Sequence, residues 1–88
     1  MKISSFYGIS ILMFEGYFPG VPHFHARYGQ SYVIVAIGSL EVLQGRGNFP
    51  SRALAFTCEW AAAKHDALMA DWSLLEQNQN PKRIAGLR

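Results

Sequence analysis

Two histidines and an arginine occupy alternate positions in the most distinctive short segment of the chain, VPHFHARYG at residues 21–29. Successive side chains of a β-strand point to opposite faces, so on a strand His23, His25 and Arg27 share one face, with the imidazoles roughly 7 Å apart. In such a row one histidine can act as a general base while the arginine holds an anion such as phosphate. These three residues are therefore the candidate catalytic residues.

The same histidine pair can also hold a transition metal, provided that a further ligand completes the set. Glu15 lies at the other end of the preceding loop and His65 comes from a later segment, so either is a conceivable third ligand. Histidine pairs at this spacing also arise by chance, and histidines that hydrogen-bond or stack at an interface are commoner. The metal set of His23, His25 and Glu15 is therefore the weaker alternative, and no cofactor is expected.

The row of polar residues also predicts a surface for a partner. Phe24, Ala26 and Tyr28 form the opposite row of the strand and make the better core face, which leaves the histidines and the arginine on the outer side. A neighbouring strand presents apolar side chains to this side. The sequence therefore predicts a pocket or a partner-binding face made of Leu12, Phe14, His23, His25 and Arg27.

The composition fits one small domain whose surface keeps some exposed apolar area. A chain of 88 residues has room for one core, so residues 1–88 are expected to form a single domain. Charged residues make up 16% of the chain, against roughly 25% in typical soluble domains, which favours a protein partner or a homo-oligomer. The net charge is only +2 and the basic residues are scattered, so nucleic acid is possible as a partner but weakly supported.

The single cysteine and the interrupted apolar run near the start of the chain indicate where in the cell the protein resides. Cys58 is the single cysteine, which excludes a disulfide within the chain and a thiolate zinc cage, and indicates a reducing cytoplasm. The apolar run near the start is interrupted by Gly8 and Ser10, and no run reaches the roughly 18 apolar residues of a membrane span. A cytoplasmic protein without a membrane partner is expected.

The elements that must position these residues are expected to form an α+β fold. Aromatic and β-branched runs, separated by glycine and proline turns, predict antiparallel strands joined in chain order, which is a β-meander over residues 1–47. The loop EGYFPGVP separates the first two strands. The four expected strands are Phe6 to Glu15, His23 to Tyr28, Tyr32 to Ile37 and Glu41 to Leu43.

A long helix is expected over residues 50–79, followed by a tail over residues 80–88. The segment has neither Gly nor a further Pro after Pro50, and its composition favours helix. A straight helix of this length would measure about 42 Å, whereas a compact chain of this size is about 30 Å across. Either the helix breaks near His65 and Asp66, or its end projects from the sheet. The stripe expected to face the sheet is Leu54, Cys58, Ala61, His65, Leu68, Trp72 and Leu75.

Several runs together resemble a known bacterial family. FYGISILMF, PHFHARYG and EVLQG, then a helix carrying EWA, a His-Asp pair and a tryptophan, and finally PKRI, are similar to domain of unknown function 4160. The resemblance implies a small bacterial protein associated with toxin–antitoxin gene pairs, without an established activity. It places the family's histidine pair on His23 and His25 and its following arginine on Arg27. The helix signature falls on Glu59, Trp60, His65 and Trp72.

The chain also departs from the pattern of the family it resembles. Leu12 stands where relatives tend to have an arginine, and Tyr32 and Ala36 stand where they tend to have acidic residues. The polar face is thereby thinned, which favours contact with another protein over an active site. The predicted function is a protein-interaction module of a toxin–antitoxin-like pair. The alternative is an RNA-acting or metal-dependent hydrolytic toxin that uses the His-x-His strand.

Overall fold

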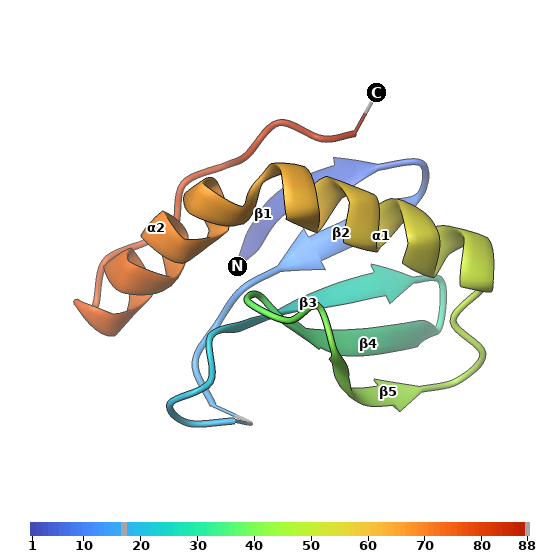
Figure 1. The fold of residues 1–88 in the computed structure, drawn as a ribbon, viewed down its shortest axis with the longest axis horizontal. Coiled ribbons are helices and arrows are strands. Elements are labelled where there is room, and N and C mark those ends of the chain that lie inside the picture. Colours follow the sequence, from blue (N-terminus) through green and yellow to red (C-terminus); the bar gives the residue numbers. More distant parts are fainter. Residues whose placement is uncertain (17, 88) are drawn as a thin grey trace.

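The computed structural model describes residues 1–16 and 18–87, which form a five-stranded antiparallel meander and two helices. The α+β class is confirmed. Figure 1 shows the helices in a layer in front of the sheet, with α2 reaching past the strand ends. The strands are β1 (Lys2–Phe6), β2 (Ile9–Leu12), β3 (His23–Tyr28), β4 (Ser31–Ala36) and β5 (Val42–Arg46), and the helices are α1 (Ser51–Ala63) and α2 (His65–Glu76).

The start of the chain forms two strands where one was expected, so the four-strand prediction was wrong. Phe6 pairs with Ile9, and the two residues between them make a tight hairpin turn. Tyr7 and Gly8 have φ values of 52° and 79°, which is the backbone that a two-residue hairpin of the right twist requires. Only β2 lies within the expected strand over 6–15, whereas β1 precedes it and shares only Phe6 with it, so the sheet gains an edge strand.

The core lies between the sheet and the helices. Ile9, Ile11 and Met13 are fully buried because alternate residues of β2 and the segment after it face the helical layer. Trp60 of α1 is the largest buried side chain, and its ring lies 5.4 Å from the Phe6 ring. The opposite residues of β2 and β3 are thereby directed to the sheet face that the helices leave open.

The helical segment breaks at Lys64 and forms two helices instead of one helix over residues 50–79. The break expected near His65 and Asp66 is therefore confirmed. Lys64 has φ −107° and ψ 21°, outside the helical region, and α2 begins at the next residue. The longest dimension of the molecule is 33 Å, shorter than one straight helix would need. None of the described helices is long and apolar enough to cross a membrane.

The buried face of the helices differs in part from the expected stripe. His65 is exposed, while Leu54, Cys58 and Leu75 are only half-buried. The break at Lys64 changes which residues of α2 face inward, so one seven-residue repeat does not describe both helices. The residues buried by α1 are Ala53, Thr57, Trp60 and Ala61, and those buried by α2 are Leu68, Asp71 and Trp72.

The segment after α2 returns along the free edge of β1 (Figure 1). The Ile84 amide donates a hydrogen bond to the Ile3 carbonyl at 2.8 Å, and the Trp60 indole donates to the Ala85 carbonyl at 2.8 Å. The segment expected as a tail therefore packs against the edge of the sheet. Tyr17 and Arg88 lie outside the described residues.

Candidate functional site

A pocket of about 160 Å³ lies on the sheet face away from the helices. Its walls come from β2, β3, β4 and the segment that follows β2, which place apolar, aromatic and cationic side chains around one space. Alternate residues of the same strands, including Ile11 and Phe24, face the core on the other side of the sheet. The lining residues therefore point away from the helices. The lining residues are Leu12, Phe14, His25, Arg27 and Tyr32.

The register of the sheet explains why these residues meet. His25 lies opposite Leu12 on β2, and Arg27 lies opposite Tyr32 on β4. Residues directly opposite each other share a face and are the closest cross-strand neighbours. The two-residue turn at Gly29 and Gln30, with Gly29 at φ 61°, pairs Tyr28 with Ser31 and so fixes this register.

His25 forms an aromatic wall of the pocket. Its ring stacks on the Phe14 ring with centroids 4.2 Å apart, and 7% of the residue is exposed. Burial lowers the pKa of His25 to about 4, and the charges of His23 and the N-terminal amine contribute smaller shifts in the same direction. The imidazole is therefore neutral at pH 7.

His23 lies beside the pocket and does not line it. Its Nδ1 donates a hydrogen bond to the Val21 carbonyl at 2.6 Å. Its ring lies 5.0 Å from the Trp72 ring of α2 and 5.8 Å from the Phe18 ring of the preceding loop. These contacts leave His23 fully buried, with its ring 5.7 Å from that of His25.

Arg27 and Tyr32 complete the rim, and Tyr32 is the residue that sequence reasoning missed as a part of the site. Arg27 is exposed, and Tyr32 is half-buried between it and Arg46, the directly opposite residue on β5. The signal for Tyr32 was present in the sequence. A two-residue turn after Tyr28 places residue 32 opposite residue 27, so the pairing follows from the turn length alone.

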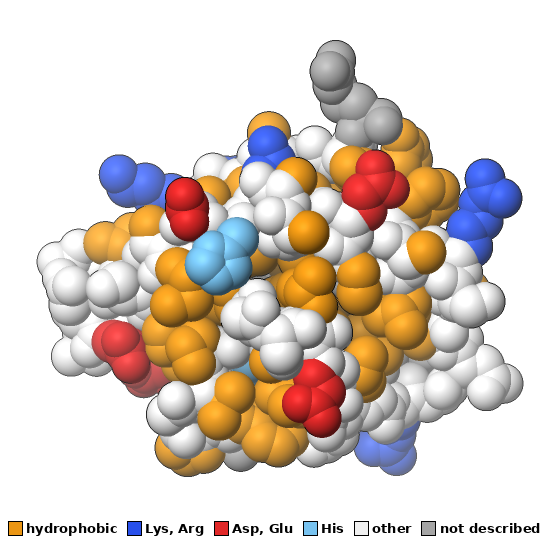
Figure 2. Space-filling model, in the orientation of Figure 1, with side chains coloured by type: hydrophobic (Ala, Val, Ile, Leu, Met, Phe, Trp, Pro, Cys, Tyr) orange, Lys and Arg blue, Asp and Glu red, His pale blue; other side chains and the backbone are white. Residues whose placement is uncertain are grey.

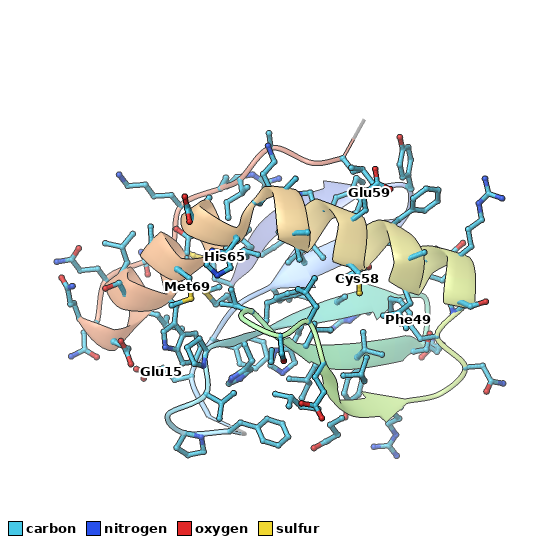
Figure 3. The ribbon with its side chains drawn as sticks, in the orientation of Figure 1. Glu15, Phe49, Cys58, Glu59, His65 and Met69 are labelled. Carbon is cyan, nitrogen blue, oxygen red and sulfur yellow. The ribbon has the colours of Figure 1, made fainter. Side chains whose placement is uncertain are left out.

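The residues weighed as metal ligands do not come together with the histidine pair. Glu15 contributes to a separate pocket beside Trp72 and Glu76, and Figure 3 shows it in the loop after β2, apart from His65 on the helices. His65 Nδ1 lies 3.2 Å from the Asp66 carboxylate. Over residues 1–16 and 18–87, no group of three His, Cys, Asp or Glu side chains is arranged to hold a metal ion.

The residues of the expected helix signature are spread over different surroundings. Trp60 is in the core and Trp72 covers His23, whereas Glu59 and His65 are exposed on the helix side (Figure 3). Cys58 is half-buried, and burial raises the pKa of its thiol. A thiol in this environment is a poor nucleophile because it stays protonated.

The arrangement can bind one small apolar group next to an anion. Leu12, Phe14 and Tyr32 supply apolar and aromatic surface, and Arg27 supplies a planar guanidinium that matches the geometry of a carboxylate or phosphate. The pocket brings together four of the five residues predicted to bind a partner, namely Leu12, Phe14, His25 and Arg27.

Comparison with protein-family models matches residues 8–73 to the family described as Domain of unknown function (DUF4160). The matched span includes every residue that lines the pocket, the buried His23 and the two tryptophans. None of the curated proteins matches the chain, and none of the solved structures does. Because the family match covers well over half of the sequence, the chain belongs to the DUF4160 family.

Proposed function

We propose that the protein is an interaction module, one half of a toxin–antitoxin-like pair, that binds its protein partner through the open face of the sheet. The observation that carries this proposal is the pocket formed by Leu12, Phe14, His25, Arg27 and Tyr32 on that face. The pair relationship comes from the family resemblance, and the location of the docking surface comes from the pocket.

The size of the pocket favours a protein partner over a small-molecule substrate. Pockets for small ligands usually measure about 300–1,000 Å³, whereas this one measures about 160 Å³. A space of this size accepts a single side chain. Interfaces commonly centre on one such anchor, surrounded by polar contacts at the rim.

The alternative function, an RNA-acting or metal-dependent hydrolytic toxin, has less support. A general base works best when its pKa is near the operating pH, and the pKa of His25 is about 4. His23 is covered by Trp72 and Phe18, so substrate does not reach it without a rearrangement. The described residues also supply no third metal ligand.

Substitution within the pocket tests the proposed function. We expect the chain to elute as a complex in size-exclusion chromatography with light scattering, either with the co-expressed product of a neighbouring gene or with a second copy. Phe14→Asp should abolish the complex because it places a charge in the apolar wall. Met69→Asp is the matched control, since Met69 is a partly exposed apolar residue on α2.

Two results would contradict the proposal. One is a monomer at high concentration that copurifies with no neighbouring gene product. The other is an equal loss of the complex in Phe14→Asp and Met69→Asp. RNA cleavage that is lost in His23→Ala and His25→Ala would instead support the hydrolytic alternative.

A further inference from the structure

The five strands carry basic residues and no acidic ones. Their charged residues are Lys2, Arg27 and Arg46, one each on β1, β3 and β5. The acidic residues all lie in loops or helices, at Glu15, Glu41, Glu59, Asp66, Asp71 and Glu76. Figure 2, which views the helix side, shows acidic and basic side chains there, scattered among broad apolar surface. Within the helices themselves, Glu59, Asp66, Asp71 and Glu76 outnumber the one lysine or arginine, Arg52. The sheet and the helical layer therefore differ in charge.

The register places all three cations on the open face. Arg27 lines the pocket, and Tyr32 lies between it and Arg46 in one row across the strands. Lys2 lies directly opposite Leu12, another lining residue. Because directly opposite residues share a face, the three cations lie on the same face as the pocket, and all three are exposed.

The centre of this face differs from its surroundings. Leu12, Phe14 and Tyr32 give the pocket an apolar interior, and the stacked His25 ring is neutral at pH 7. A complementary ligand therefore has an apolar group at its centre and negative charge around it. Complementary charge at the rim of an interface selects the partner and accelerates its association.

We propose that the partner docks an acidic protein segment on this face, with one apolar side chain in the pocket and flanking Asp or Glu carboxylates paired with Arg27, Arg46 and Lys2. The inference rests on the proposed function and adds the chemistry of the partner to it. An RNA ligand is less well matched, because single-stranded RNA needs exposed aromatic platforms along a basic groove, and the aromatic rings here are half-buried.

Peptide display tests this inference without knowledge of the natural partner. A random library selected on the immobilised chain should become enriched in sequences with one Leu, Met or aromatic residue between Asp or Glu residues. A selected peptide should lose about tenfold or more of its affinity to an Arg27→Glu, Arg46→Glu double variant, because two rim charges are reversed. It should also bind more weakly in 500 mM than in 50 mM NaCl.

A control variant and three contradicting outcomes complete this experiment. Arg52→Glu, Arg83→Glu is a charge-matched double variant on α1 and the tail, and it should bind the peptide as the native chain does. Selection without acidic enrichment, an equal effect of both double variants, or tighter binding of single-stranded poly(U) RNA would overturn the inference. The natural complex with the neighbouring gene product separates the two proposals. If Phe14→Asp disrupts that complex but high salt does not weaken it, the partner's segment is not acidic, while the proposed function as an interaction module is still supported.

Discussion

Two buried titratable side chains carry the clearest consequences at the scale of single residues. His25 is neutral in the fold because burial lowers its pKa, whereas burial raises the pKa of the Asp71 carboxyl. Both groups pack against other parts of the chain, Phe14 for the first and Lys82 for the second. Each should therefore couple protonation to folding, and the two couplings have opposite signs.

His25 should make the fold less stable as the pH falls. Its pKa is about 4 in the folded state, against an ordinary value of 6.5 for an exposed histidine, so the unfolded chain binds more protons between these limits. The free energy of unfolding should then decrease from pH 6.5 to pH 4, by an amount on the order of 1–3 kcal/mol. Denaturant unfolding at several pH values should show a flatter profile for His25→Phe than for the native chain.

His65→Gln is the control for this experiment, because the His65 side chain is half exposed and lies far from the pocket on α2. It should keep the native pH profile between pH 6.5 and pH 4. The same profile in the native chain, His25→Phe and His65→Gln would mean that His25 is not buried as described.

Asp71 should tolerate loss of its charge better than loss of its oxygen. Its Oδ1 accepts the Lys82 amide at 2.9 Å, and the residue is 3% exposed. Asp71→Ala leaves that amide without its acceptor and should cost about 1–3 kcal/mol, whereas Asp71→Asn keeps an acceptor oxygen. Thermal unfolding at pH 7 should therefore rank the stabilities of the variants as Asn above Ala.

The pH dependence gives a second check on Asp71. Its pKa is raised from the ordinary value of 3.8, so the folded state holds the proton more tightly, and stability should fall as the pH rises through this range. Asp71→Asn should remove that decrease. A variant profile that still falls in the same window would contradict the account.

At the scale of elements, strands and turns were predictable to the extent that their local signals were strong. The valine and isoleucine run of β4, the alternating aromatic and polar residues of β3 and the Gly29 turn between them identify this pair of strands, and the turn length fixes their register. The division of residues 1–15 into two strands was missed because Tyr7 adopts a positive φ that glycine, asparagine and aspartate favour. A Tyr-Gly pair is a weak turn signal compared with the Asn-Gly or Asp-Gly pairs that usually mark such a hairpin.

The surroundings of the candidate site were less predictable than its strands. Alternation along β3 places Phe24 and Ala26 in the core as expected, whereas Tyr28, the third residue of that row, is exposed. On the other side of the strand, His25 and Arg27 line one pocket. The burial of His23 depends on Trp72, which is remote in sequence and lies on α2, after the break at Lys64. No local pattern reports such a contact, because it depends on how the layers are placed.

Gly86 should be required for the tail to pack on β1. A Cβ atom there would lie 2.8 Å from the Ser5 carbonyl oxygen, which is backbone and cannot move aside easily. Gly86→Ala should cost about 1–3 kcal/mol by overpacking and should speed hydrogen exchange at the Ile84 amide. Gly38→Ala is the control, because nothing lies within 4 Å of its added Cβ, and similar effects of both substitutions would contradict the packing described.

At the scale of the whole molecule, the two edges of the sheet differ. The tail covers part of the β1 edge through the Ile84–Ile3 hydrogen bond. β5 is the last strand of the sheet, and over the described residues no further strand pairs with it. An uncovered strand edge offers unpaired backbone groups to another chain. The native chain therefore has one edge protected and one edge available.

Removal of the tail should expose the second edge. A chain ended after Asn80 loses the hydrogen bonds that Ile84 and Ala85 make with Ile3 and Trp60. We expect this chain to associate at concentrations where the full chain does not, as measured by light scattering, while circular dichroism checks that the sheet persists. A truncated chain that keeps its fold and the native mass would contradict a protective role for the tail.

The contact between β1 and the segment after α2 predicts how these two segments vary among relatives. The residues matched to the family, 8–73, leave out both β1 and the segment that covers it, yet Ile3 and Ile84 bond to each other and Gly86 lies against Ser5. A deletion at one terminus removes the partner of the other, so selection acts on both together. Relatives that keep one of these two segments should accordingly keep the other, and residues in contact between the two segments should co-vary.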